Sequence, residues 1–128
     1  MENKSFLIDT HIFIWWMENS KNLSSEIKQL LQDPQQKVFL SVVSIWEMLI
    51  KQSKNQLRLP KDMEEGVIES GYTILPIAFP HAIGLKDLPL LHTDPFDRML
   101  IAQAKVEGLT LITADKKIWQ YDLSLLKM

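Results

Sequence analysis

The sequence predicts a three-layer α/β/α sandwich, in which helices cover both faces of a central parallel sheet of four to five strands. Its apolar runs, such as residues 6–8 and 38–40, are short and lack a polar alternation, which is typical of strands buried on both faces. Segments with helical spacing separate these runs. We therefore expect alternating strands and helices in a single domain spanning residues 1–128.

The expected strands are bounded by turn residues and helix caps. We place them at residues 5–9, 37–40, 72–75 and 109–113, with an edge strand at 123–126. In a parallel sheet of this kind, functional groups gather outside the carboxyl ends of the strands. Asp9 and Asp115 both follow such an end, which gives the first indication of a site.

The expected helices begin at capping residues and end at proline or glycine. They cover residues 10–17, 24–32, 41–52, 61–70, 80–86 and 115–121, and a further helix runs from the Asp94-Pro95 start to Gly108. In that last helix, Phe96, Leu100 and Ala104 lie on one apolar stripe.

Composition restricts the chemistry. Apolar residues make up 46% of the chain and the net charge is −2, as in an ordinary globular protein. There is no cysteine, so any metal must bind oxygen or imidazole ligands. The apolar run at residues 12–17 is too short to span a bilayer and lacks the features of a signal peptide. We expect a cytoplasmic protein without a membrane segment.

Four acidic residues stand at positions that call for an explanation. Asp97 falls in the first turn of its helix, where an acid can also serve the helix dipole alone. Asp9 and Asp115 can each be read as a simple helix cap. Glu47 lies on a stripe with Val43 and Ile50, where a carboxylate needs a cation or hydrogen-bond donors; the alternative is a surface ion pair with Lys51.

A joint site for these acids implies a cation. Carboxylates about 5 Å apart repel by roughly 3 kcal/mol per pair at an effective dielectric constant near 20. Hard divalent ions bind oxygen ligands, and Mg²⁺ or Mn²⁺ suits a site where a few carboxylates are supplemented by water and phosphate. Such an ion activates water for hydrolysis of a phosphodiester bond. The pattern therefore indicates a metal-dependent nuclease.

The sequence resembles the PIN domain family, and in particular its VapC-type ribonuclease toxins. The residues that carry the match are 7–11 (Leu-Ile-Asp-Thr-His), 44–47 (Ser-Ile-Trp-Glu), 94–104 and 111–115. They span essentially the whole chain in the family's order. The segment at 94–104 is the most specific part of the match.

The resemblance implies the roles of several residues. Asp9, Glu47, Asp97 and Asp115 match the family's metal-site acids, and Thr10 and Thr113 match supporting hydroxyl positions. It implies Mg²⁺- or Mn²⁺-dependent endoribonuclease activity, a homodimer, and a cognate antitoxin whose tail occupies the acidic cleft. Asp94 is an additional acid, which we expect to cap its helix rather than bind metal.

A basic segment is the candidate RNA path. Lys51, Lys54, Arg58 and Lys61 occur without an intervening acid, and together with Arg98 they could guide an RNA backbone, although a solvated face is the alternative. Such contacts would position RNA without reading its sequence.

Histidine and tryptophan are not expected to carry the chemistry. His11, His81 and His92 share no helical spacing, so we expect no zinc site from them, although His11 could lie at the edge of the site. For Trp15, Trp16, Trp46 and Trp119 we expect core packing or a protein interface rather than base stacking.

Two other functions remain open. An aspartyl-nucleophile phosphatase also places an Asp after its first strand, but it usually has a second acid two residues later, where this chain has His11. A catalytically silent PIN-like module that only binds a protein partner is the non-enzymatic alternative; the presence of all four acids argues against it.

Overall fold

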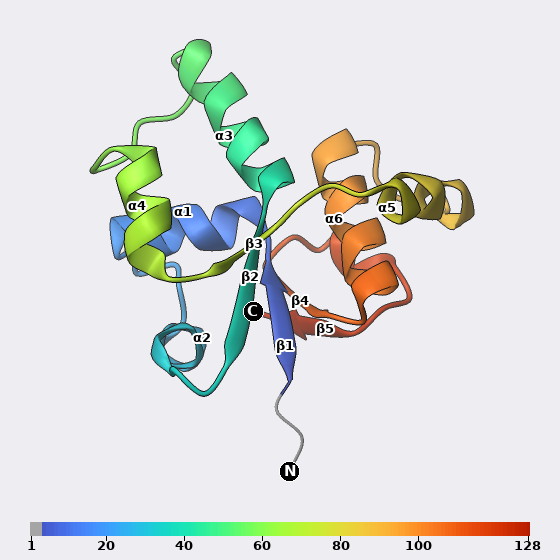
Figure 1. Ribbon diagram of the computed structural model, residues 1–128, viewed down its shortest axis with the longest axis horizontal. Helices are drawn as coiled ribbons and strands as arrows, with labels where there is room; N and C mark the ends of the chain where they lie inside the picture. Colours follow the sequence, from blue (N-terminus) through green and yellow to red (C-terminus); the bar gives the residue numbers. More distant parts are fainter. Residues whose placement is uncertain (1–3) are drawn as a thin grey trace.

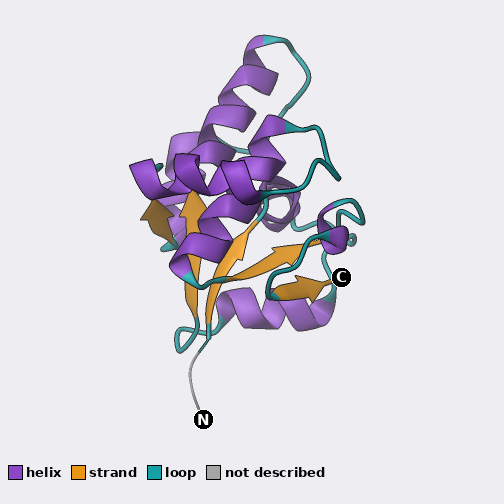
Figure 2. Ribbon diagram, turned by 90° about the vertical axis from the view of Figure 1, so that its right-hand side faces the viewer, coloured by secondary structure: helices purple, strands orange, loops and turns teal. Residues whose placement is uncertain are grey.

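The sheet is built from five parallel strands, and the computed structural model describes residues 4–128 of the chain. The strands are β1 (Ser5–Ile8), β2 (Lys37–Ser41), β3 (Thr73–Leu75), β4 (Thr110–Thr113) and β5 (Leu125–Lys127). Their order is β3-β2-β1-β4-β5, and every neighbouring pair is parallel. The strand arrows turn progressively from one edge of the sheet to the other in Figure 2, which is the usual twist.

Helices cover both faces of this sheet (Figure 1). They are α1 (Thr10–Glu18), α2 (Ser25–Gln32), α3 (Val42–Ser53), α4 (Met63–Ser70), α5 (Phe79–Gly84) and α6 (Pro95–Glu107), with short 3₁₀ helices at Leu85–Asp87 and Ile118–Gln120. Helices α1, α2 and α4 lie on one side, α5 and α6 lie on the other, and α3 rises from the end of β2. The predicted α/β/α sandwich is confirmed.

Successive residues of the central strand point into two separate cores. Phe6 and Ile8 of β1 pack with α1 and α2, whereas Leu7 packs with α6 residues such as Leu100 and Ile101. This explains why the strands show no polar alternation, since both of their faces are buried. Leu7 and Ile8 have no exposed surface.

A buried polar network fixes α6 to its neighbours. The Ser41 hydroxyl at the end of β2 donates to Gln103 Oε1 at 2.6 Å, and Gln103 Nε2 donates to the Pro76 carbonyl at 3.2 Å. His81 of α5 accepts the Ala78 N–H through Nδ1 and pairs with Glu107 through Nε2 at 2.8 Å. These contacts set the position of α6, and therefore of the acid in its first turn.

Several predicted boundaries shift because a side chain caps the helix. Asp9 ends β1 one residue early, since its carboxylate accepts the Ile12 N–H at 2.9 Å and caps α1. Asp62 caps α4, which therefore begins at Met63 rather than Lys61. Gly108 ends α6 with φ +69°, as its position predicts.

The helix predicted at 115–121 is wrong. Asp115 Oδ1 accepts the Lys117 N–H at 2.9 Å, and Trp119 Nε1 donates to the Thr113 carbonyl at 3.1 Å, so the chain folds back in a turn. A single 3₁₀ helix at Ile118–Gln120 is all that forms. The edge strand lies at Leu125–Lys127, slightly beyond the predicted range.

Candidate active site

The four predicted acids come from four elements that meet at the carboxyl edge of the sheet. Asp9 follows β1, Glu47 lies in α3, Asp97 lies in the first turn of α6, and Asp115 follows β4. The carboxylates of Asp115 and Glu47 act electrostatically on Asp9, and those of Glu47 and Asp9 act on Asp97. The four groups therefore share one electrostatic environment, as a joint site requires.

Asp9 is buried, with 3% of its surface exposed. Burial raises the pKa of Asp9 to about 6, and the nearby Asp115 and Glu47 carboxylates contribute to the rise. Hydrogen bonds from the Thr113 side chain and the Ile12 N–H partly oppose this shift in pKa. Thr113 also accepts the Asp115 N–H at 3.0 Å, so this threonine connects two of the acids.

Asp97 is held at the start of α6 by the predicted cap. Asp94 Oδ1 accepts the N–H groups of Phe96 and Asp97, at 2.8 and 3.0 Å, which confirms Asp94 as the capping residue. Burial raises the pKa of Asp97 to about 7; the Asp94 carboxylate is the next cause of the rise, and the hydrogen bond with His92 opposes it.

Glu47 is buried, and both of its carboxylate oxygens have a partner. The Thr10 hydroxyl donates to Glu47 Oε1 at 2.7 Å, and the Ser44 hydroxyl lies 2.9 Å from that of Thr10. Lys51 Nζ lies 2.9 Å from Glu47 Oε2. The ion pair with Lys51 is thus present, but Glu47 is 4% exposed, so the pair is not the surface contact that the alternative reading describes.

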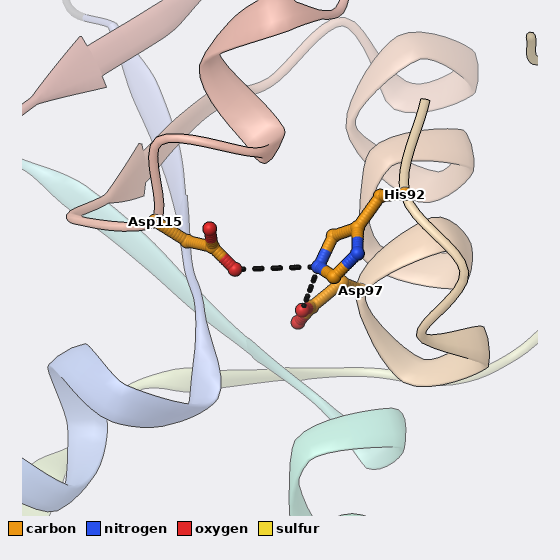
Figure 3. Close-up of side chains that lie close together, drawn as sticks. All are labelled: His92, Asp97 and Asp115. Atoms are coloured by element: carbon orange, nitrogen blue, oxygen red, sulfur yellow. Dashed lines mark hydrogen bonds and ion pairs between the residues drawn. The ribbon is translucent and has the colours of Figure 1, made fainter. Parts of the chain in front are cut away.

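His92 lies among the acids, a position that the spacing of the histidines in the sequence did not indicate. Its Nε2 lies 2.8 Å from Asp97 Oδ2 and 3.3 Å from Asp115 Oδ2 (Figure 3). One potential ligand atom from each of these three residues lies within 4.8 Å of the other two. His92 precedes α6 in a loop, so the periodicity of a helix could not reveal this contact; the nearby Asp94-Pro95 helix start was the only signal in the sequence.

The other histidines stay away from this cluster. His11 is exposed, whereas His81 is buried in the network with Gln103 and Glu107. Within residues 4–128, no group of three potential ligands other than His92, Asp97 and Asp115 comes as close together.

The basic residues divide into two kinds. Lys54 and Arg58 are exposed, whereas Lys51 pairs with Glu47 and Lys61 pairs with Glu69. Arg98 donates to the carbonyls of Leu88 and Pro89, at 3.4 and 3.0 Å, and to the Tyr121 hydroxyl at 3.2 Å. These bonds assign the Arg98 guanidinium a structural role in the loop before α6.

The tryptophans differ in their surroundings. Trp15 and Trp16 pack against the first core, as expected, and Trp119 bonds the Thr113 carbonyl. Trp46 is 53% exposed and meets Phe96 edge-on, with ring centroids 5.1 Å apart. Core packing therefore does not account for Trp46.

The donor set fits a hard divalent cation. In the described part of the chain, no lysine or arginine forms an ion pair with Asp9, which is buried, or with Asp97, whose side chain is 17% exposed. Their raised pKa values express the unfavourable energy of ionising buried carboxyls that lack a positive partner. A divalent ion with carboxylate ligands would supply the missing charge.

Comparison with known proteins points to one family. The PIN domain family model matches residues 6–123. The chain is similar to ribonuclease VapC22 of Mycobacterium tuberculosis (strain ATCC 25618 / H37Rv), with 26% identity across an alignment that covers 88% of each chain.

Solved structures share the fold. VapBC2 from Rickettsia felis, bound to a DNA fragment from its promoter, aligns with a TM-score of 0.71 at 16% identity, covering 96% of this chain and 98% of that one. A toxin–antitoxin complex from Klebsiella pneumoniae aligns with a TM-score of 0.67 at 20% identity, covering 94% of each. At these identities the likeness concerns the fold alone. The family match over residues 6–123 identifies the chain as a member of the PIN domain family.

Proposed function

We propose that this protein is a Mg²⁺- or Mn²⁺-dependent endoribonuclease that hydrolyses RNA phosphodiester bonds as the toxin of a toxin–antitoxin pair. The observation that carries the proposal is the convergence of Asp9, Glu47, Asp97 and Asp115 from four elements at one edge of the sheet. The 26% identical relative is named as a ribonuclease, which supports this choice of substrate.

In this proposal the four acids bind the ion, and neighbouring hydroxyl groups orient the acids. Asp9, Asp97, Asp115 and Glu47 would be the ligands or the near neighbours of the ion, which when bound would activate water and neutralise charge on the scissile phosphate. Thr113 orients Asp9 and the Asp115 backbone, and Thr10 orients Glu47. Helices α1 and α6 begin beside the acids, at the caps Asp9 and Asp94, so the positive ends of both helix dipoles would favour an anionic substrate there.

RNA would approach along the basic segment at the end of α3. Lys54 and Arg58 are exposed and can contact phosphates at the surface. Lys51 lies closer, at the Glu47 carboxylate, and its ammonium could bind a phosphate oxygen at the rim of the site. Contact of Lys61 or Arg98 with RNA stays a prediction. Lys61 pairs with Glu69 and Arg98 donates to the Pro89 carbonyl, so either side chain would have to exchange a protein partner for a phosphate.

The proposed partners are a cognate antitoxin and a second copy of the chain. Solved relatives of the same fold are described as VapBC or toxin–antitoxin complexes, and this supports an antitoxin here. An RNA substrate would place the activity in the cytoplasm. Among residues 4–128, no helix is both long and apolar enough to cross a membrane.

The proposal is tested by RNA cleavage with a matched variant. Purified protein, free of antitoxin, should cleave single-stranded RNA in Mg²⁺ or Mn²⁺, and excess chelator should stop the reaction. Asp97→Asn should reduce cleavage by at least about a hundredfold, as for the loss of a group that stabilises the transition state, while leaving the melting temperature at or above that of the native protein. The exposed acid Asp87, changed to Asn, is the control.

Two results would contradict the proposal. Equal cleavage in excess chelator would exclude the metal requirement. Turnover of a phosphomonoester without cleavage of RNA would favour the aspartyl-nucleophile phosphatase instead.

A further inference from the structure

We propose that His92 is a positioning residue, which holds the Asp97 and Asp115 carboxylates together by donating its Nε2–H and does not itself bind the ion. The inference rests on the proposed function, because it concerns the same metal site. Neither the family match nor the sequence assigns His92 a role.

The first argument is the place of the ring between two like charges. His92 Nε2 is 2.8 Å from Asp97 Oδ2 and 3.3 Å from Asp115 Oδ2, and Figure 3 shows one nitrogen facing both carboxylates. Asp97 belongs to α6 and Asp115 to the segment after β4, so this nitrogen joins two elements that are far apart in the sequence. A single N–H donor between the two carboxylates reduces their repulsion and fixes their separation.

The second argument concerns the other ring nitrogen. His92 Nδ1 is buried, and no group within residues 4–128 forms a hydrogen bond with it. Nδ1 lacks a partner in either neutral tautomer, at a similar cost of about 1–3 kcal/mol, so the tautomer is decided at Nε2, which faces oxygens of Asp97 and Asp115. Histidines that bind metals almost always donate that second N–H to a partner. The two carboxylate oxygens at Nε2, together with the lack of an acceptor at Nδ1, therefore favour the tautomer that carries its proton on Nε2, as a donor.

The third argument is that the loop holds the ring in place without an ion. The Tyr121 hydroxyl accepts the N–H groups of Leu91 and His92, at 3.1 and 3.0 Å, and donates to the Pro89 carbonyl at 2.8 Å. Arg98 binds the Pro89 carbonyl as well. His92 itself is 8% exposed. Hydrogen bonds within the protein therefore fix the loop that carries the ring, as expected of a group that positions the ligands of a metal site.

The test is cation affinity measured without RNA. We suggest determining the Mn²⁺ dissociation constant from the free-ion EPR signal for the native protein, His92→Gln and His92→Asn. The Gln side chain can place an amide N–H where His92 has Nε2, whereas the same amide in Asn is one methylene too short. We expect His92→Gln to bind Mn²⁺ within about threefold of the native protein, and His92→Asn to bind about 10–100 times more weakly.

A second measurement uses the native protein alone and so does not depend on the folding of the variants. Pulsed EPR of the bound Mn²⁺ should show no coupling to a directly bound ¹⁴N nucleus. Such a coupling would overturn the inference, because it would make His92 a ligand. Equal affinity of native protein and His92→Asn would also overturn it while leaving the proposed ribonuclease intact. Failure of the native protein to bind Mn²⁺ would overturn both.

Discussion

At the scale of single residues, two buried carboxyl groups determine how the protein responds to pH. The pKa of Asp97 is raised to about 7 and that of Asp9 to about 6, in both cases chiefly by burial. In the folded protein, each carboxyl group is therefore lower in free energy when it is protonated or when a cation lies beside its carboxylate. The same property that makes these acids costly in the metal-free protein suits them to bind an ion.

Metal-free protein should lose stability as the pH rises. Between the unfolded pKa of 3.8 and the folded value of about 7, the folded state binds more protons at Asp97 than the unfolded state does. The free energy of unfolding should therefore fall from about pH 4 to about pH 7 and then level off, with Asp9 contributing up to about pH 6. Urea denaturation in excess chelator across this range measures the slope.

Two variants isolate the contribution of Asp97. Asp97→Asn should reduce the fall to the part that Asp9 contributes below about pH 6, whereas Asp87→Asn, at an exposed acid on the protein surface, should keep the native slope. An Asp97→Asn protein with the full native slope would show that this carboxyl is not the source.

The sequence was enough to select the four acids as candidates, but it could not predict their surroundings. Strand ends, a helix start and an apolar stripe were enough to select Asp9, Asp97, Asp115 and Glu47. The position of His92 beside Asp97 could not be predicted, because His92 lies in a loop. The hydrogen bond from the His92 N–H to the Tyr121 hydroxyl helps to place this loop, and with it the ring, at the site.

At the scale of elements, the loop before α6 depends on one hydroxyl group. Tyr121 is buried, and its hydroxyl satisfies the backbone of Pro89, Leu91 and His92. Tyr72 provides a natural contrast, because no partner within residues 4–128 reaches its buried hydroxyl, and burial raises its pKa.

Tyr121→Phe and Tyr72→Phe should therefore differ in sign. Tyr121→Phe leaves two backbone N–H groups and one carbonyl with fewer partners, and should lower the free energy of unfolding by about 1–3 kcal/mol. Tyr72→Phe removes a hydroxyl that gains nothing in the fold, and should be neutral or stabilising. Chemical denaturation of both variants makes the comparison, and equal losses would contradict the assigned hydrogen bonds.

Local signals fixed the helices where caps and breakers were strong. Asp94, Pro95 and Gly108 bound α6 as predicted, because each acts locally: Asp94 through its capping carboxylate, and Pro95 and Gly108 through their backbone conformation. The helix at 115–121 failed because Asp115 uses its carboxylate for a turn with Lys117, and because Trp119 bonds back to Thr113. Both contacts compete with helix formation, and apolar spacing does not report them.

At the scale of the whole molecule, the sheet brings the site together. β1 is central, with β2 and β4 as its neighbours, so the chain segments that leave these three strands meet at one edge. The buried runs of the sequence predicted a parallel sheet, because both cores require apolar side chains. The strand order could not be read from those runs, since it depends on how helices of similar character pack.

A shared ion should stabilise the whole fold. A cation that binds only the folded state adds about 2.7 kcal/mol at a hundred times its dissociation constant, and should raise the melting temperature as its concentration rises. The double variant Asp9→Asn with Asp97→Asn should show a flat response to Mn²⁺. Thermal scans of both proteins over a range of Mn²⁺ test this, and a flat response in the native protein would contradict a site on the folded chain.

The most direct measurement is anomalous diffraction from a crystal soaked in Mn²⁺. The central claim is that carboxylates from α3, α6 and the ends of β1 and β4 surround one cationic position. We predict an anomalous peak within bonding distance of Asp97 and Asp115 and facing Asp9, with the His92 ring hydrogen-bonded to the carboxylates beside it. Crystals that show Mn²⁺ only at other surface positions, with this cluster unchanged, would contradict the account.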